Sequence, residues 1–305
     1  MRIIAEIIEF QKKNTLFWSF FCTFAPNFVR IIIKFMAKKV LFINQEIDPY
    51  VAETHMSIMG RELPQKMQEA GFEIRTFMPK WGTINERRGQ LHEVIRLSGM
   101  NLIIDDTDHP LIIKVASIPT TRQQIYFIDN DDYFTRRQMA ADEQGVEYKD
   151  NGERAIFFAR GVLETVKKLR WQPDVIVCQG WVSAVVPFYI KTAYAEEPSF
   201  ANSKVIISLY TNELKGELGT HFKRCVEFRD AKSELLADYK EDFDFTELGK
   251  MAIDYSDGVI EGESLADRTL LDYANEKSKP TLAYPGDDFA DAYKTFINEV
   301  CPDEE

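Results

Sequence analysis

The sequence predicts an α/β fold with a doubly wound, mostly parallel, Rossmann-like sheet. Near-continuous apolar runs such as 38–45 and 174–179 are typical of strands that are covered on both faces. Segments with apolar residues at three- and four-residue steps, typical of amphipathic helices, alternate with these runs. Since successive β–α–β units cross over right-handedly, this alternation favours a parallel sheet.

The elements follow one another along the chain. We expect strands at 38–45, 72–82, 109–119, 123–130, 174–179, 204–210, 257–262 and 279–286. We expect helices at 57–70, 150–170, 183–195 and 264–274, with a mostly helical, charged stretch at 214–254. The central parallel strands are expected to hold residues 40–42, 175–177 and 205–207. Pro64 predicts an irregularity in the first helix, and Gly71 predicts its end.

We predict one domain over 36–305, with its sheet ending near Tyr284 and an irregular insert at about 82–150. Residues 1–35 differ in composition and form an extension that we expect to lie outside the fold. Its apolar run, 16–25, follows two lysines as in a signal peptide, but it is too short for a bilayer, which needs about 20 residues. A misassigned start codon before Met36, a signal or anchor, and a native amphipathic helix all stay open.

Charge and cysteine content exclude several classes of protein. The net charge of −12 argues against nucleic acid as a partner, because phosphate binding needs a basic surface. Cys22, Cys178, Cys225 and Cys301 have no metal-ligand spacing, so we expect no metal site and free thiols in a reducing cytoplasm. Cys178 follows a strand and could be a nucleophile, but a buried apolar residue is the simpler interpretation.

Catalytic motifs are absent from the sequence. It contains neither a G-x-G-x-x-G dinucleotide fingerprint nor a P-loop. His55 follows the first strand, and a solvated loop histidine is its simplest interpretation. We expect surface positions for His92, His109 and His221, and turns or solvated faces for acidic pairs such as Asp131-Asp132.

Four segments resemble the bacterial glycogen synthases and plant starch synthases. "KVLFINQEIDPY" with "ELPQKMQEAGFEIRTFMPKWGTI" is similar to that family's opening. "YFIDNDDYFTRR" with "YKDNGERAIFFARGVLE", "WQPDVIVCQGWVSAVVPFYIK" and "FTELGKMAIDYSDGVIEGESLADRTL" resemble later segments in the same order. The resemblance implies half of a two-domain glycosyltransferase fold, in which ADP-glucose and an α-1,4-glucan meet between two Rossmann-like domains.

Carried over residue by residue, the resemblance implies that the donor-site motifs have changed. The family's K-T-G-G-L falls on residues 52–56, so Ala52 replaces the lysine, and Thr54 and His55 replace the glycines. Glu53 adds a negative charge where a diphosphate would repel it. Gln179 and Gly180 replace a histidine and an aspartate of H-A-H-D-W.

Trp181 is retained from that second motif, and a wall of the core or cleft is its simplest interpretation. Tyr210 replaces the histidine of T-I-H-N. The candidate cleft residues are therefore Glu53, Thr54, His55, Gln179, Trp181, Tyr210 and Asn212. We identify no catalytic residue among them.

Three function classes remain open. The chain could be a non-catalytic descendant that binds a glucan, a small sugar or a protein partner. It could be an α-glucan glucosyltransferase when a separate chain supplies the donor domain, or an enzyme of different chemistry that uses the changed residues. We expect no cofactor, with ADP-glucose a donor only if the family activity is retained. We also expect a cytoplasmic protein, no nucleic acid partner and no membrane partner.

Overall fold

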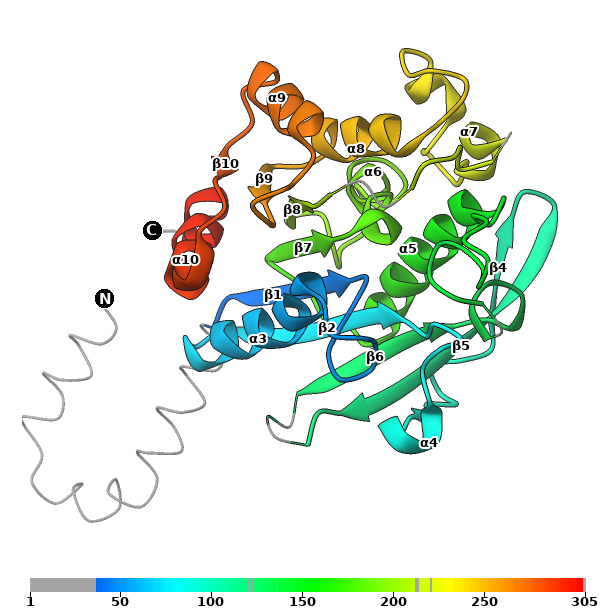
Figure 1. The fold of residues 1–305 in the computed structure, drawn as a ribbon, viewed down its shortest axis with the longest axis horizontal. Helices are drawn as coiled ribbons and strands as arrows, with labels where there is room; N and C mark the ends of the chain where they lie inside the picture. The colour runs from blue at the N-terminus through cyan, green and yellow to red at the C-terminus, as the bar shows by residue number, and fades with distance from the viewer. Residues whose placement is uncertain are drawn as a thin grey trace, which may run out of the picture. The chain divides into compact units, whose positions relative to one another are not determined.

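A sheet of parallel strands with an antiparallel edge organises the described chain. The computed structural model describes residues 37–119, 121, 123–135, 137–211, 214–219 and 221–303; the extension 1–35 and Asn212 lie outside them. The strands run in the order β10-β9-β8-β7-β1-β2-β6-β5-β3, and β4 pairs with β5 (Figure 1). The pairs from β10 to β6 are parallel, whereas β3, β4 and β6 each pair antiparallel with β5.

The strands are β1 (Lys39–Asn44), β2 (Glu73–Pro79), β3 (His92–Glu93), β4 (Met100–Ile104), β5 (Thr107–Ser117), β6 (Gln124–Asp129), β7 (Val175–Gln179), β8 (Lys204–Leu209), β9 (Gly258–Glu261) and β10 (Thr281–Leu282). The prediction of a doubly wound, mostly parallel sheet is confirmed. The strands β1, β7 and β8, which hold the three predicted central runs, each have neighbours on both sides.

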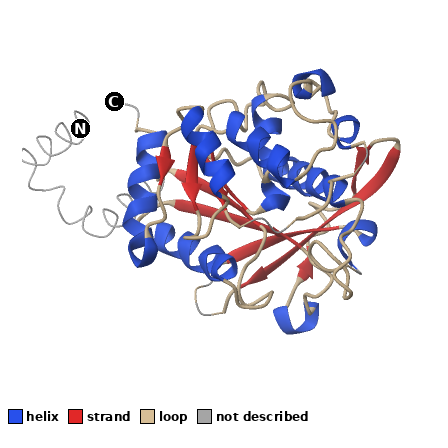
Figure 2. Cartoon of the chain, turned by 45° about the horizontal axis from the view of Figure 1, so that its top comes forward, coloured by secondary structure: helices blue, strands red, loops and turns tan. Residues whose placement is uncertain are grey.

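The α-helices are α3 (His55–Glu69), α4 (Glu86–Gly89), α5 (Asn151–Lys168), α6 (Val186–Lys191), α7 (Phe222–Cys225), α8 (Phe245–Asp254), α9 (Arg268–Glu276) and α10 (Phe289–Val300). Helices cover both faces of the sheet (Figure 2). On β1, Val40 and Phe42 pack with Tyr293 and Phe296 of α10, whereas Leu41 belongs to the core under α5 and α8. Burial on both faces explains why this strand is an unbroken apolar run.

The first helix begins earlier than its pattern predicted. Thr54 caps α3: its hydroxyl accepts from the Ser57 amide at 3.0 Å, and the Thr54 amide donates to the Ser57 hydroxyl at 2.8 Å. This reciprocal capping box starts the helix at His55. The helix continues through Pro64 and ends before Gly71, whose φ of +99° favours glycine.

Two helix predictions were wrong in extent, and one helix was not predicted. The predicted helix 183–195 is only α6, because Pro187 near its start has no amide to continue the preceding 3₁₀ turn, Trp181–Ser183. The stretch 214–254 is mostly irregular before α8, since it lacks a continuous apolar stripe. Helix α10 was not predicted, although Tyr293, Phe296 and Ile297 have helical spacing and are buried.

The insert is more regular than expected, and one of its histidines is not on the surface. The strands β4 and β5 form a hairpin, and β5 extends the sheet beyond β6. His92 and His221 are exposed as predicted, but His109 is only 6% exposed. The prediction for His109 fails because β5 turns this ring toward Tyr133 and Phe157, where aromatic side chains cover it.

Candidate functional site

The strand order reverses between β1 and β7, since β2 lies on one side of this pair and β8 on the other. In an open α/β sheet, ligands bind outside the carboxyl ends of the strands at such a switch point. The segments that leave β1, β7, β8 and β9 therefore form the candidate site. This edge holds Gln179, Trp181 and Tyr210 together, and Thr54 and His55 begin the helix after β1.

A buried polar row crosses the sheet at this edge. Asn44 of β1 pairs in register with Gln179 of β7, and Gln179 pairs with Ser208 of β8. All three side chains are almost fully buried. Within the described residues, Asn44 Oδ1 and Gln179 Oε1 have no hydrogen-bond partner, whereas Ser208 interacts with the Tyr293 hydroxyl. Buried polar atoms usually have partners, so this row can accept a water or a ligand group.

Two side chains that the sequence analysis proposed for the cleft contact each other. The Gln179 amide nitrogen donates to the Tyr210 hydroxyl at 3.2 Å, and Tyr210 is 5% exposed. The loop after β9 closes over this ring: a Cβ on Gly262 would lie 2.7 Å from it. Gln179 and Tyr210 therefore fill the space between strand and loop.

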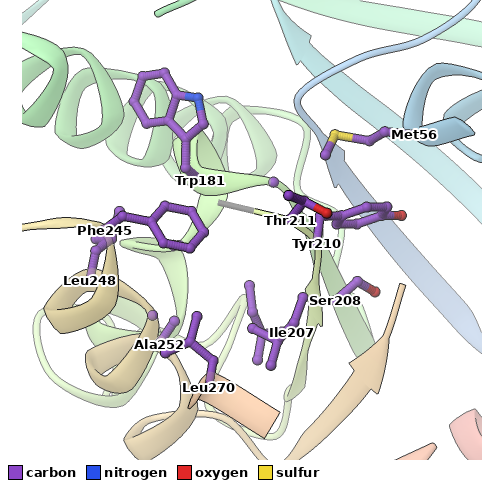
Figure 3. A pocket seen from close by; sticks show the side chains of 14 residues that line it. Met56, Trp181, Ile207, Ser208, Tyr210, Thr211, Phe245, Leu248, Ala252 and Leu270 are labelled. Atoms are coloured by element: carbon purple, nitrogen blue, oxygen red, sulfur yellow. The ribbon is translucent and has the colours of Figure 1, made fainter. Parts of the chain in front are cut away.

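Trp181 forms one wall of a small apolar cavity. The ring is 3% exposed, and Met56, Phe245 and Tyr210 line the same cavity (Figure 3). The cavity has a volume of about 30 Å³. A single water needs about 10–15 Å³ by this measure, so the cavity has room for about two waters. The prediction that Trp181 is a core or cleft-wall residue is confirmed.

The loop after β7 has a backbone conformation that requires glycine. Gly180 has φ +81° and ψ 166°, a region that residues with a Cβ hardly enter. A Cβ at this position would lie 2.4 Å from Gln45 Oε1. Gln45 is itself fully buried and lies directly after β1. The two strand exits at the switch point are therefore in direct contact.

The loop before α3 carries acidic and capping groups. The Thr54 hydroxyl donates to Glu46 Oε2 at 2.5 Å, and Glu46 is buried. Glu53 is exposed beside it. His55 is half-buried, with Nε2 3.1 Å from the Gly262 carbonyl oxygen and its ring edge-on to Tyr284. His55 is thus not the solvated loop residue that the sequence suggested, because it joins α3 to the loop after β9.

A larger open groove adjoins this edge. It has a volume of about 480 Å³ and lies between the exit of β8 and the start of α9. Its walls are Thr211, Glu261, Ser264, Leu265, Ala266, Asp267, Arg268 and Thr269. Side-chain carboxylates hold the loops by accepting backbone amides: the Thr211 amide donates to Glu263 Oε1 at 2.6 Å, and the Asp267 side chain caps α9.

Several residues of the site were not predicted from the sequence. Gln45 and Glu46 directly follow the opening apolar strand, and that polar pair at a strand exit was a usable signal. Ser208 was also detectable, as the polar residue in a run of apolar ones. Arg268 and Thr269 had no signal, because only the fold brings α9 beside the exit of β8.

The described residues give no support for a cysteine nucleophile, a metal site or a membrane-spanning helix. Cys178 is fully buried, and burial raises the pKa of its thiol far above the ordinary range, so it is not an activated nucleophile. Among the residues that the structure places, no cluster of three His, Cys, Asp or Glu side chains could hold a metal ion. Within the same residues, no helix is long and apolar enough to cross a membrane.

Known proteins resemble the chain over most of this fold. The model of the starch synthase catalytic domain matches residues 39–262. The glycogen synthase of Chlorobium limicola is 38% identical over 181 residues, 59% of this chain and 37% of its own length. That of Chlorobaculum tepidum is 39% identical over 173 residues, 56% of this chain and 36% of its own length. The chain thus spans a little over a third of the length of these curated relatives.

A solved structure agrees with the sequence match. The catalytic domain of starch synthase IV from Arabidopsis thaliana, bound to ADP and acarbose, has a TM-score of 0.66 at 17% identity. The match covers 81% of this chain and 51% of that one. At this identity the likeness shows the fold, and the matched family model covers well over half of the chain. The chain belongs to the starch synthase catalytic domain family.

Proposed function

We propose that this chain is a sugar- or partner-binding member of its family that does not transfer glucose by itself. One observation carries the proposal: the edge of the sheet where ligands would bind is filled by the chain's own side chains. The cavity left at the switch point is about 30 Å³, whereas small-molecule sites are about 300–1,000 Å³. The contact of Gln179 with Tyr210, under the Gly262 loop, occupies the remaining space.

The charges of the loop before α3 also disfavour a nucleotide sugar. Ala52 stands where the family's lysine would meet the diphosphate, and the carboxyl groups of Glu46 and Glu53 lie nearby in the same loop. The Thr54 hydroxyl is already used by the helix cap and by Glu46. A contact to a charged group contributes about 1.5–3 kcal/mol, so one lost lysine corresponds to roughly 10- to 150-fold in affinity.

The open groove is a better candidate for a ligand. Its volume of about 480 Å³ falls within the range for small-molecule sites. Its walls offer the hydroxyls of Ser264 and Thr269, the carboxylates of Glu261 and Asp267, and the guanidinium of Arg268. Mixed donors and acceptors suit the hydroxyls of a neutral sugar, whereas the two carboxylates repel a diphosphate. We therefore propose a small sugar or the end of a glucan as the ligand.

An assembled glucosyltransferase is the second candidate. Its support is the fold that the chain shares with the starch synthase IV structure, which was bound to ADP and acarbose. In this alternative a separate chain supplies the donor-binding half, and the two halves together transfer glucose to an α-glucan. The alternative requires the Gln179–Tyr210 contact to open, because donor and acceptor must both reach the switch point.

Calorimetry on the full chain tests the proposal. We expect measurable binding of maltooligosaccharides, and no binding or turnover with ADP-glucose or UDP-glucose. Arg268→Ala should weaken sugar binding at least about tenfold, the loss of one hydrogen bond to a charged group. Arg88→Ala on α4, outside the groove, is the matched control and should change nothing.

Two results would contradict the proposal. Micromolar binding of ADP-glucose, or glucose transfer by this chain alone, would show that the edge of the sheet opens and that catalysis is retained. Sugar binding that Arg268→Ala leaves unchanged, but Tyr210→Phe weakens, would place the ligand at the switch point instead of the groove.

A further inference from the structure

The loop that follows β9, residues 262–267, takes part in both the open groove and the switch point. We call this segment the β9 loop. Its Gly262 covers the ring of Tyr210, since a Cβ on this glycine would lie 2.7 Å from the ring. The walls of the groove that belong to the β9 loop are Ser264, Leu265, Ala266 and Asp267. One short segment is therefore a wall of the groove and the cover of the switch point.

The exit of β8 binds the β9 loop on one side. The Gly262 amide donates to the Leu209 carbonyl oxygen at 2.8 Å. The Thr211 amide donates to Glu263 Oε1 at 2.6 Å, and the Thr211 hydroxyl donates to the Leu265 carbonyl oxygen at 2.8 Å. These three hydrogen bonds fix the first part of the loop in the position in which it lines the groove.

His55 binds the β9 loop from the start of α3. Its Nε2 lies 3.1 Å from the Gly262 carbonyl oxygen. A carbonyl oxygen only accepts, so Nε2 donates in this contact, and both the neutral and the charged ring can do so. The ring also lies edge-on to Tyr284, with 5.7 Å between the ring centroids, and the Tyr284 amide donates to Glu261 Oε2 at 3.1 Å. His55 therefore joins α3 to both segments that hold the end of β9.

We propose that His55 is a positioning residue that holds the β9 loop closed, so that the closed loop shapes the groove for its ligand and covers the switch point. The inference rests on the proposed function, in which the groove binds a small sugar or the end of a glucan. Among the described residues, His55 does not line the groove, so it acts on a groove ligand only through the loop. Opening the loop would uncover Tyr210, but it would also displace the groove walls Ser264 and Leu265.

The closed loop couples the two sites. A ligand that needs the groove walls in place binds the closed loop better than the open one, and so it shifts the population toward the closed loop. A ligand that needs Gln179 and Tyr210 uncovered shifts the population the other way. By linkage, each ligand then weakens the binding of the other by the same factor. A sugar in the groove would thus keep the switch point covered.

Hydrogen exchange of the ligand-free chain, read residue by residue by NMR, tests the role of His55. A hydrogen bond between uncharged groups corresponds to a factor of about 2 to 12 in an equilibrium. In His55→Ala, the amides of Gly262 and Thr211 should therefore exchange about 2- to 12-fold faster than in the wild type, because exchange follows local opening. The amides of β7 should keep their rates, since the core does not open with the loop.

A conservative variant separates positioning from general packing. His55→Gln keeps an N–H donor at a similar reach, so it should restore most of the protection of the Gly262 amide. His92→Ala, at an exposed histidine on β3, is the control and should change neither rate. Should His55→Ala not fold, Glu263→Ala takes its place. It removes the acceptor of the Thr211 amide, and it should speed exchange of the Gly262 amide in the same way.

Maltotriose tests the coupling. At about ten times its Kd it should slow exchange of the Gly262 amide in the wild type about tenfold, since it binds the closed loop. It should bind His55→Ala more weakly than the wild type, and His55→Gln nearly as well as the wild type.

Several results would overturn the proposal. Exchange of the Gly262 amide that stays unchanged in His55→Ala and in Glu263→Ala would do so, and so would a rise of equal size in β7. Maltotriose that binds the wild type but leaves the exchange of this amide unchanged would refute the coupling. A wild-type chain that binds no maltotriose would count against the proposed function, whereas the exchange of the ligand-free chain would still decide the role of His55.

Discussion

Replacing Gly180 by alanine tests the backbone conformation and the close packing against Gln45 at the switch point. Gly180 has φ +81° and ψ 166°, and such strained conformations cost about 1–3 kcal/mol in residues with a Cβ. The added Cβ would lie 2.4 Å from Gln45 Oε1 and 2.7 Å from Gln45 Cβ. Gln45 is fully buried and cannot swing into solvent, so overpacking adds about 1–3 kcal/mol. We expect Gly180→Ala to lower the free energy of unfolding by about 2–6 kcal/mol.

Urea unfolding of the full chain measures this change, provided that the slope with urea is the same in both proteins. Gly99→Ala is the matched control, because Gly99 has φ +82° but open space around its Cβ position. The control carries only the backbone cost, so the difference between the two variants reports the contact with Gln45. Equal losses in the two variants would refute the close contact, and no loss at Gly180 would refute the backbone conformation as well.

The result also bears on the proposed change of the donor site. In the proposed correspondence with the family's H-A-H-D-W motif, an aspartate falls on Gly180, which has a conformation that only glycine adopts easily. Gly180→Asp adds a carboxylate to the same tight contact and is expected to destabilise the chain more than Gly180→Ala. Under the proposed correspondence, a single aspartate at this position would therefore meet both the strained backbone and the close contact with Gln45.

Three further predictions address the core and the pH dependence. Arg154 is fully buried and donates to four oxygen atoms. Arg154→Met should therefore lower the free energy of unfolding in urea by about 3 kcal/mol or more, against less than about 0.5 kcal/mol for the exposed control Arg88→Met. A small loss of stability in Arg154→Met would show that those oxygens find other donors. The Cys178 thiol should react with a thiol reagent only as fast as the chain unfolds, while the half-buried Cys301 reacts in the native state; equal rates would contradict the buried position. Burial raises the pKa of Tyr50 from 10.0 to about 12. The stability that this tyrosine contributes below pH 10 should therefore be lost as the pH rises toward 12, and Tyr50→Phe should remove that part of the loss. Parallel curves of stability against pH for the two proteins would count against this prediction.

Much of the fold could be predicted from local patterns. The run at 40–43 is apolar without interruption because β1 is covered by helices on both faces, and the same reason holds for the apolar runs of β7 and β8. The helix 150–170 was predicted within two residues of α5, since its apolar stripe repeats at helical steps. Helix α6 was predicted too long at both ends, and Pro187 in its first turn accounts for its late start.

The candidate site could be predicted only in part. The strand exits at Gln179 and Tyr210 were identified from sequence, because ligands bind at the carboxyl ends of parallel strands. The hydrogen bond between Gln179 and Tyr210 was not predicted, since it depends on the register between β7 and β8. Likewise, His109 was predicted at the surface because its partners lie 23 or more residues away in sequence.

The sequence by itself determined the fold class, the strand exits and the family, because these depend on local periodicity and on motif order. Only the tertiary structure decided that the edge of the sheet is filled, that the open groove lies beside α9, and that His109 is buried. These features depend on which distant side chains meet. The register of strand pairing and the packing of helices determine those contacts, and they depend on burial over the whole chain and not on local sequence.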